Sequence, residues 1–274
     1  MKVLQLDKLH DEAQELLDNN FDVVGIEDTF NSNEIEAVVL RTFSSFKRER
    51  MDKYSNLKYV IQCSVGVDNL DLDEIARRGI KLMHVPGTNS NSVAEHTMFL
   101  MLSLFRSKAP FFELKGKTVG IVGFGQIGKI VARKLLGFEC KVIAFDVIEQ
   151  DVAILKELGV EMCDMSCVLE KSDVVSVHVP LNKYTHNLIG AKEFALMKKE
   201  SFFINTSRSE IVEEDALLDS LDQFRGVGLD VDSDKLKNKE KVINTMHVAA
   251  QGEDSFRLQC AKPIEKFLKD IGKI

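Results

Sequence analysis

The sequence predicts an α/β protein made of two units, each with a parallel sheet. Short apolar runs alternate with stretches of helical periodicity along the chain, and strands alternating with helices imply parallel pairing with right-handed crossovers. A glycine-rich turn at residues 123–128 joins one apolar run to a helix near the middle of the chain. The length of 274 residues is enough for one large domain or two ordinary ones.

The first unit occupies the first part of the chain. Apolar runs predict buried strands at residues 2–6, 21–26, 37–40, 59–63 and 80–85. The spacing of Ala13, Leu16 and Leu17 predicts a helix after the first strand. A short helix is expected at residues 72–78, closed by Gly79 as a C-cap. A loop at residues 86–91 ends this unit.

The second unit begins with a very apolar helix, expected at residues 92–106. Ser92 and Glu95 are expected to form a capping box at its start, and a helix that is apolar nearly all round must be buried between domains or subunits. Further strands are predicted at residues 119–122, 142–145, 173–179, 202–206, 226–231 and 242–248. Further helices are predicted at residues 152–158, 191–197, 213–221 and 251–268.

The glycine turn has the pattern Gly123-Phe-Gly125-Gln-Ile-Gly128 and opens a helix that Gly137 is expected to end. The first glycine permits the tight turn, the second lets the backbone approach a pyrophosphate, and the third lets the helix pack close to the strand. The helix N-terminus adds free N–H groups.

Asp146 lies 18 residues after Gly128, where a carboxylate can accept from a ribose 2′-OH. Because the acid would repel a 2′-phosphate, the whole pattern favours NAD. The alternative is a structural turn without a ligand.

The amino-acid composition excludes several classes of partner and of stabilising site. Hydrophobic residues make up 45% and charged residues 29%, and the net charge is −7. This balance argues against nucleic acid or an anionic membrane as partner, but not against a small anion. The chain has no long apolar run and its start lacks the features of a signal peptide. Five cysteines without paired spacing argue against a disulfide framework or zinc site, so we expect no metal and a cytoplasmic protein; a redox or metal pair at Cys163 and Cys167 is the weaker alternative.

Ligands of open parallel sheets bind beyond the carboxyl ends of the strands. Two residues predicted there suit hydride-transfer chemistry: Arg208 can hold a carboxylate bidentately, and His247 can move a hydroxyl proton near neutral pH. A nicotinamide cofactor would carry the hydride. His178 more often acts structurally or through its backbone. The other histidines are expected to be surface or satisfied core residues: His10, His84, His96 and His186.

The chain resembles the D-isomer-specific 2-hydroxyacid dehydrogenases, most nearly the phosphoglycerate and glycerate dehydrogenase/glyoxylate reductase branch. The resemblance rests on segments in the family's order: SVGVDNLDLDEIARRGIKLMHVPGTNSNSVAEHT, LKGKTVGIVGFGQIGKIVA, SDVVSVHVPLNKYTHNLIG, MKKESFFINTSRSEIVEEDAL, GVGLDV and TMHVAA. It implies a Rossmann dinucleotide-binding domain at residues 91–250, inserted in a flavodoxin-like substrate domain at residues 1–90 and 251–274. The site would lie in the cleft between them. A homodimer packed through the cofactor domain and the 92–106 helix is also implied.

The resemblance also implies roles for individual residues. Arg208 would bind the substrate carboxylate, His247 would be the general acid/base, and Asp230 would contact the nicotinamide side. Substrate binding would use Ser64, Val65, Gly66 and Arg208. Cofactor binding would use Gly123, Gly125, Gln126, Ile127, Gly128, Asp146, His178, Val179, Pro180, Thr185, Thr206, Ser207 and Asp230.

One departure from the family concerns the partner of His247. The family places a Glu four to five residues after the DV of GVGLDV, where it keeps the catalytic histidine protonated. Strict counting puts Lys235 there, and a lysine would disfavour the protonated imidazole whereas a carboxylate would favour it. We therefore expect Asp234 to take the Glu role, with Asp232 in reserve.

Other departures affect the substrate and the dimer. Ser209 stands where the family has Gly, Met246 replaces the usual Pro, and Gln62 stands where phosphoglycerate enzymes tend to have Arg, which weakens the case for a phosphorylated substrate. The segment at residues 107–114 is shorter than usual, which leaves the dimer geometry open.

The leading interpretation is an NAD-dependent oxidoreductase. It would transfer a hydride between nicotinamide and a small anionic D-2-hydroxyacid or 2-keto acid of the glycerate, 3-phosphoglycerate or glyoxylate class. The alternative is an NAD(H)-sensing binding protein of the same fold without turnover, since the family also contains transcriptional corepressors. The presence of both Arg208 and His247 favours the enzyme.

Overall fold

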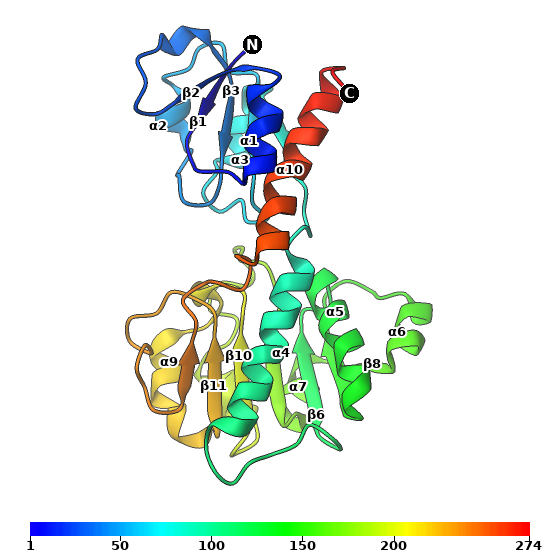
Figure 1. The fold of residues 1–274 in the computed structure, drawn as a ribbon. Helices are drawn as coiled ribbons and strands as arrows, with labels where there is room; N and C mark the ends of the chain where they lie inside the picture. The colour runs from blue at the N-terminus through cyan, green and yellow to red at the C-terminus, as the bar shows by residue number, and fades with distance from the viewer. The chain divides into compact units, whose positions relative to one another are not determined.

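The computed structural model describes residues 1–274 and divides the chain into two compact units. One unit comprises Met1–Asn89 together with Gly252–Ile274, and the other comprises Ser90–Gln251. Each unit contains one parallel sheet, five-stranded in the first and seven-stranded in the second. In Figure 1 the first unit carries α1 and α10, and the second carries α4, α5 and α9.

The first unit has the strand order β2-β1-β3-β4-β5, which is the flavodoxin-like order expected from the resemblance. Its strands are β1 Lys2–Gln5, β2 Asp22–Gly25, β3 Ile35–Leu40, β4 Tyr59–Gln62 and β5 Lys81–Met83. Its helices are α1 Asp11–Asp18, α2 Arg48–Met51, α3 Leu72–Arg77 and α10 Glu253–Asp270, with a 3₁₀ turn, η1, at Ser32–Glu34. The helices α1 and α10 lie side by side and pack their apolar residues over one face of the sheet.

The second unit has the strand order β12-β11-β10-β9-β6-β7-β8, with every pair parallel. Its strands are β6 Thr118–Val122, β7 Lys141–Phe145, β8 Val160–Met162, β9 Val174–Val177, β10 Phe202–Asn205, β11 Gly226–Leu229 and β12 Val242–Asn244. Its helices are α4 Ser90–Ser107, α5 Gln126–Leu135, α6 Val152–Leu158, α7 Met165–Lys171, α8 Ala191–Leu196 and α9 Glu214–Asp219. The 3₁₀ turns are η2 Leu136–Phe138, η3 Ser209–Ile211 and η4 Leu221–Gln223.

Two glycines bring α4 close to β11. A Cβ added at Gly226 would lie 2.9 Å from Leu104 Cδ2, and one added at Gly228 would lie 3.3 Å from Leu100 Cβ. The helix therefore packs against the strand at a distance that a side chain would prevent. Figure 1 shows α4 lying across the sheet beside β10 and β11.

The capping box predicted at the start of this helix is wrong. The helix α4 begins at Ser90, two residues earlier than expected. Ser92 instead donates its Oγ hydrogen to the carbonyl oxygen of Ala249 at 2.6 Å, and the Glu95 carboxylate accepts from Asn91 and Lys134. Both side chains have tertiary partners, which local sequence patterns do not reveal.

The end of α5 also differs from the expectation. Gly137 was expected to end the helix, but it lies inside η2, and the left-handed residue is Glu139, with φ 53°. The helix tightens into a 3₁₀ turn before the chain reverses. The strand β8 and the helices α2 and α7 were not predicted, because each is short and lacks a long periodic pattern.

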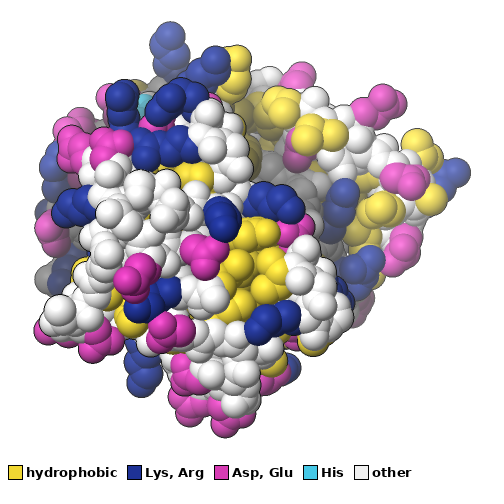
Figure 2. Space-filling view, turned by 90° about the horizontal axis from the view of Figure 1, so that it is seen from above, with side chains coloured by type: hydrophobic (Ala, Val, Ile, Leu, Met, Phe, Trp, Pro, Cys, Tyr) yellow, Lys and Arg dark blue, Asp and Glu magenta, His cyan; other side chains and the backbone are white.

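Charged side chains of both signs intermingle on the face seen in Figure 2. Ion pairs at the surface of the first unit include Lys2 with Glu34 at 2.7 Å and Lys81 with Asp270 at 2.9 Å. Such exposed pairs contribute little to stability.

None of the helices is long and apolar enough to cross a membrane.

Candidate active site

The glycine turn lies where the strand order of the second sheet reverses. The strand β6 pairs with β7 on one side and with β9 on the other, and ligands of doubly wound sheets bind at such a switch point. Gly123 has φ 96°, and a Cβ added there would lie 2.8 Å from the carbonyl carbon and oxygen of His178. Only glycine fits between the carboxyl ends of β6 and β9.

The next two glycines shape the N-terminus of α5. Gly125 is the N-cap, its first turn has no side-chain cap, and a Cβ added there would meet nothing within 4 Å. A Cβ added at Gly128 would lie 2.4 Å from the carbonyl oxygen of Gly123. The helix is thus held tightly against the strand end while its N-terminus stays open. This open, uncapped N-terminus suits a phosphate group.

Gln126 and Ile127, the two residues between Gly125 and Gly128, lie in different environments. Gln126 is exposed, and its Oε1 lies 3.3 Å from the Ser90 hydroxyl, which donates to it. Ile127 is half-buried and packs against the apolar core. A cofactor here would meet the backbone of both residues and the amide of Gln126.

Asp146 follows β7 and is tied to the glycine turn. Its Oδ2 accepts from the N–H of Phe124 at 2.7 Å, and its Oδ1 accepts from the N–H of Ile148 at 2.8 Å. Each carboxylate oxygen keeps a second lone pair that can accept from a hydroxyl. The residue therefore fits the proposed role toward the ribose of NAD.

His178 is buried between β9 and the glycine turn. Burial lowers the pKa of its imidazole to about 4, so the ring is neutral near pH 7. Its Nε2 lies 2.9 Å from the Ser176 hydroxyl, while Nδ1 is buried without a partner. The backbone N–H donates to Val122, and the carbonyl abuts Gly123. A ring held neutral by burial is poorly suited to proton transfer at neutral pH.

The loop after His178 contains three further cofactor-binding candidates. Val179 is half-buried and its Cγ1 lies close to Gly123, whereas Pro180 is exposed. Thr185 donates its hydroxyl to the carbonyl of Pro180 at 2.6 Å and accepts from the N–H of Asn182 at 2.8 Å. These bonds hold the loop in a compact turn beside the glycine turn.

The segment after β10 carries Thr206, Ser207 and Arg208. Buried Asn205 organises it: its Oδ1 accepts from the N–H of Ser207 at 2.9 Å, and its Nδ2 donates to the carbonyl of Arg208 at 2.8 Å. Arg208 Nη1 donates to the carbonyl of Ser207 at 2.8 Å. Sequence reasoning missed Asn205, although an Asn directly before a polar strand end is a recognisable turn former.

The hydroxyl groups of Thr206 and Ser207 anchor the same segment. Thr206 Oγ1 lies 3.1 Å from Oγ1 of Thr97 in α4, and Ser207 Oγ donates to the carbonyl of Val177 at 3.0 Å. Ser209, which replaces the family glycine, begins η3 and is not among the residues with positive φ. The serine therefore needs no left-handed backbone and is tolerated.

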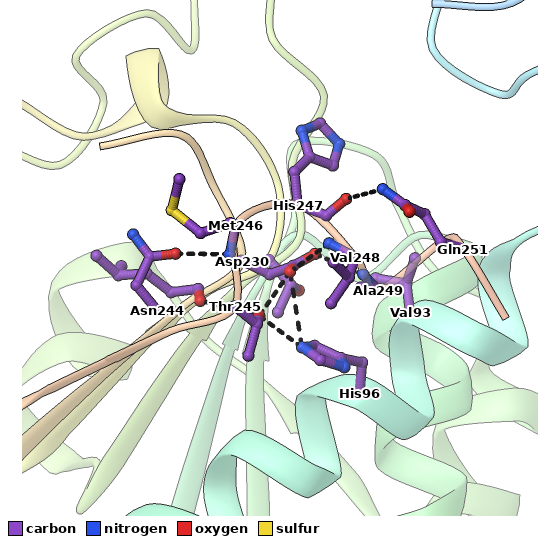
Figure 3. A network of polar contacts seen from close by, with 12 residues as sticks. Val93, His96, Asp230, Asn244, Thr245, Met246, His247, Val248, Ala249 and Gln251 are labelled. Carbon is purple, nitrogen blue, oxygen red and sulfur yellow. Dashed lines mark hydrogen bonds and ion pairs between the residues drawn. The ribbon is translucent and has the colours of Figure 1, made fainter. Parts of the chain in front are cut away.

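Asp230 lies at the end of β11 and is only 1% exposed. Its Oδ1 accepts from the Thr245 hydroxyl at 2.6 Å and from the N–H of Val248 at 2.8 Å, and its Oδ2 accepts from the N–H of Ala249 at 2.9 Å. Figure 3 shows this network beneath the loop that carries His247. The carboxylate is thus largely engaged in holding that loop.

His247 has φ 62° and a side chain that is 43% exposed. In Figure 3 its ring points away from Asp230 and His96. Its Nδ1 lies 4.0 Å from Oδ2 of Asp232. Asp234 is exposed and makes no hydrogen bond or ion pair. Lys235 donates to Asp215 in α9 at 2.5 Å, away from the imidazole.

The candidate substrate loop in the first unit is held through its carbonyl groups. Buried Gln62 donates to the Ser64 hydroxyl at 2.6 Å and to the carbonyl of Gly66 at 2.8 Å, and His84 Nε2 lies 2.9 Å from the carbonyl of Val65. Burial lowers the pKa of His84. The backbone N–H groups of Val65 and Gly66 make no hydrogen bond. They are free to bind an anion.

Cys163 offers little nucleophilic or ligand chemistry. All the cysteines are free thiols. Burial raises the pKa of Cys163 to about 12, with a further contribution from its hydrogen bond to Cys167. Because the thiolate is the form that binds metals and attacks electrophiles, Cys163 is inert near neutral pH.

Comparison with known proteins assigns the family. The NAD binding domain of the D-isomer specific 2-hydroxyacid dehydrogenases matches residues 88–251. The chain therefore belongs to the D-isomer-specific 2-hydroxyacid dehydrogenase family, and the identification made from the sequence motifs is confirmed. The match to an NAD binding domain also supports NAD as the cofactor.

Individual relatives agree with this assignment. The chain is 30% identical over 266 residues to a hydroxypyruvate reductase of Thermotoga maritima, covering 87% of this chain and 86% of that protein. It is 36% identical over 224 residues to a glyoxylate reductase of Thermofilum pendens, covering 73% of this chain and 66% of that protein. A crystal structure of a D-lactate dehydrogenase from Aquifex aeolicus with NAD and lactic acid is 28% identical, with a TM-score of 0.88 and coverage of 99% and 96%.

Proposed function

We propose that this protein is an NAD-dependent oxidoreductase that moves a hydride between nicotinamide and a small D-2-hydroxyacid or 2-keto acid. The observation that carries the proposal is the common edge of the second sheet. The glycine turn, Asp146, Arg208 and His247 all follow strands of that sheet at their carboxyl ends. A dinucleotide site, a carboxylate ligand and a proton donor are the groups that this chemistry requires.

In this proposal one unit binds NAD and the other binds the substrate. Residues 91–250 form the NAD-binding domain, which agrees with the family match to residues 88–251. Residues 1–90 and 251–274 form the substrate-binding domain. The unpaired N–H groups of Val65 and Gly66 support this assignment, since they can donate to a carboxylate.

The reaction would use three kinds of group. Bound NAD supplies or accepts the hydride. Arg208 binds the substrate carboxylate and orients the carbon that reacts. His247 donates the proton to the carbonyl oxygen during reduction, or accepts it during oxidation.

Asp232 is the proposed carboxylate partner of His247. Its Oδ2 is 4.0 Å from Nδ1 of the imidazole, and a nearby carboxylate favours the protonated ring. Asp234, preferred from the sequence, makes no such contact and remains the second candidate. Lys235 pairs with Asp215, so it does not oppose protonation of His247 as strict counting suggested.

A substrate without a phosphate group is favoured. Gln62 stands where phosphoglycerate enzymes tend to have Arg, and its amide nitrogen is already bonded to Ser64, Gly66 and Asn69. It therefore offers neither charge nor a spare donor.

The test is oxidation of NADH and NADPH against glyoxylate, hydroxypyruvate and 3-phosphohydroxypyruvate. We expect turnover with NADH and one of the first two acids, and at least about tenfold lower kcat/KM with the phosphorylated acid and with NADPH. Binding of NADH without turnover on any 2-keto acid would instead indicate the NAD(H)-sensing protein. No structural observation supports that alternative.

A homodimer and a cytoplasmic location remain predictions. The apolar side chains of Phe99 and Leu102 in α4 are 52% and 39% exposed, whereas the opposite face of the helix is buried. An exposed apolar stripe on a helix of this family is a natural subunit interface. Sedimentation at micromolar concentration should give a dimer, and Phe99→Glu should shift it toward the monomer.

A further inference from the structure

The loop that presents His247 has an unfavourable backbone. Met246 has φ 57° and His247 has φ 62°, so two consecutive residues with side chains occupy the left-handed region. Such conformations persist only where surrounding contacts hold them, and they are typical of functional sites. The contacts that hold this loop therefore determine where the imidazole of His247 lies.

Asp230 supplies the central contact. It accepts the N–H groups of Val248 and Ala249, the two residues directly after His247, and it accepts the hydroxyl of Thr245. Asn244 adds a bond before the strained pair, because its Oδ1 accepts from the N–H of Met246 at 2.9 Å. These bonds leave the loop little freedom on either side of His247.

His96 reaches this network from α4. Its Nε2 lies 2.7 Å from Oγ1 of Thr245 and 3.6 Å from Oδ1 of Asp230, and its side chain is 16% exposed. Figure 3 shows the ring rising from the helix toward both residues. His96 is thus a largely buried, hydrogen-bonded histidine, in keeping with the satisfied core alternative expected from the sequence, and its partners belong to the network that holds the His247 loop.

The donors and acceptors can be assigned by counting hydrogens. The single hydroxyl hydrogen of Thr245 faces Asp230 Oδ1 at 2.6 Å and the carbonyl of Leu229 at 3.3 Å, and both of these groups only accept. The bond at 2.7 Å must then use a hydrogen on Nε2 of His96. The hydrogen-bond chain runs from His96 through Thr245 to Asp230, and Asp230 holds the loop.

The packing of α4 fixes the position of His96. Gly226 and Gly228 let Leu104 and Leu100 approach β11, and Ser92, one turn before His96, donates to the carbonyl of Ala249 at 2.6 Å. The helix therefore contacts the loop through two side chains from the same face. Neither contact is made to the candidate cofactor-binding turn.

From this geometry we infer that His96 is a positioning residue for His247. Its Nε2–H fixes Thr245, and Thr245 with Asp230 holds the loop in the left-handed conformation that presents the imidazole. The role assigned to His247 rests on the proposed function, but the fixing of the loop does not.

The test compares His96→Phe, which keeps a ring without a donor, with His96→Gln, whose amide nitrogen reaches nearly as far as Nε2. Glu95→Gln on the same helix is the control, because Glu95 contacts Asn91 and Lys134 and not the loop. Hydrogen exchange of the Val248 and Ala249 amides is measured without cofactor, and kcat and the KM for NADH are measured with the best 2-keto acid. Thr245→Val, alone and with His96→Phe, provides a second route to the same contact.

We expect about fivefold faster exchange at both amides and about tenfold lower kcat in His96→Phe, with the KM for NADH within twofold. His96→Gln should recover most of both effects, and Thr245→Val should reproduce them without adding to His96→Phe. Unchanged exchange in His96→Phe and Thr245→Val would overturn the inference, and so would equal loss in His96→Phe and His96→Gln. If wild type turns over no 2-keto acid, the proposed function fails, while the exchange data still decide whether His96 fixes the loop.

Discussion

Oδ2 of Asp232 lies 4.0 Å from Nδ1 of His247, and no other carboxylate comes within that distance of the imidazole. The Asp232 side chain is 79% exposed, so the interaction is screened by water. The contribution of this pair to catalysis should therefore be small.

Asp232→Asn tests this pair. Loss of the carboxylate removes the one acid within 4.0 Å of the imidazole of His247, so kcat/KM for reduction should fall by about two- to threefold. Asp234→Asn, with the same charge change two residues away, should leave kcat/KM unchanged. A loss in Asp234→Asn but not in Asp232→Asn would return the role to the residue favoured from the sequence.

Gly123→Ala and Gly125→Ala should separate folding from cofactor binding. The first puts a methyl group 2.8 Å from the His178 backbone at φ 96°, so we expect a loss of about 1 to 3 kcal/mol of stability or more. The second adds a methyl group in open space at the N-terminus of α5, so it should leave thermal unfolding unchanged and weaken NADH binding about tenfold. Gly137→Ala, also in open space, is the control for both measurements. Normal NADH affinity in Gly125→Ala would contradict the placement of the phosphates.

Asp146→Asn should relax the choice of cofactor. Removing the charge removes repulsion of a 2′-phosphate, so the ratio of kcat/KM for NADPH to that for NADH should rise at least about tenfold. Glu149→Gln, an exposed acid three residues on, controls for the change in net charge. An unchanged ratio in Asp146→Asn would place the ribose elsewhere.

His178 should make the protein sensitive to acid. Burial lowers the pKa of its ring from 6.5 to about 4, so the unfolded chain binds this proton first as pH falls. The associated stability is fully present above pH 6.5 and is lost progressively down to about pH 4, by roughly 2 to 3 kcal/mol. Denaturant unfolding at pH 7 and pH 4.5 should show a smaller loss in His178→Gln than in wild type, whereas exposed His186→Gln should follow wild type. Equal losses in all three proteins would refute this role.

The predictability of the fold and the site depended on the range of the contacts involved. The glycine turn and Asp146 follow from local geometry, since backbone freedom at Gly123 and close packing at Gly128 are demands of one βαβ unit. The parallel pairing of the strands follows from the alternation of strands and helices. These features could be read from the sequence because each is decided within a short stretch of chain.

Contacts between distant segments could not be read in this way. Ser92 bonds to Ala249 and His96 bonds to Thr245, although each pair is separated by about half of the chain. The preference for Asp234 over Asp232 came from counting along the family motif, whereas the turn after β11 points Lys235 toward α9. Where the loop runs is set by Asp230 and α4, and neither influence is visible in the local sequence.

The most direct test of the central claim is turnover by three purified proteins with NADH and either glyoxylate or hydroxypyruvate. Wild type should oxidise NADH, while His247→Asn and Arg208→Gln should lose at least about a hundredfold in kcat/KM and still bind NADH within about threefold of wild type. Failure of wild type to turn over any 2-keto acid would contradict the account. Full activity in either variant would contradict it equally.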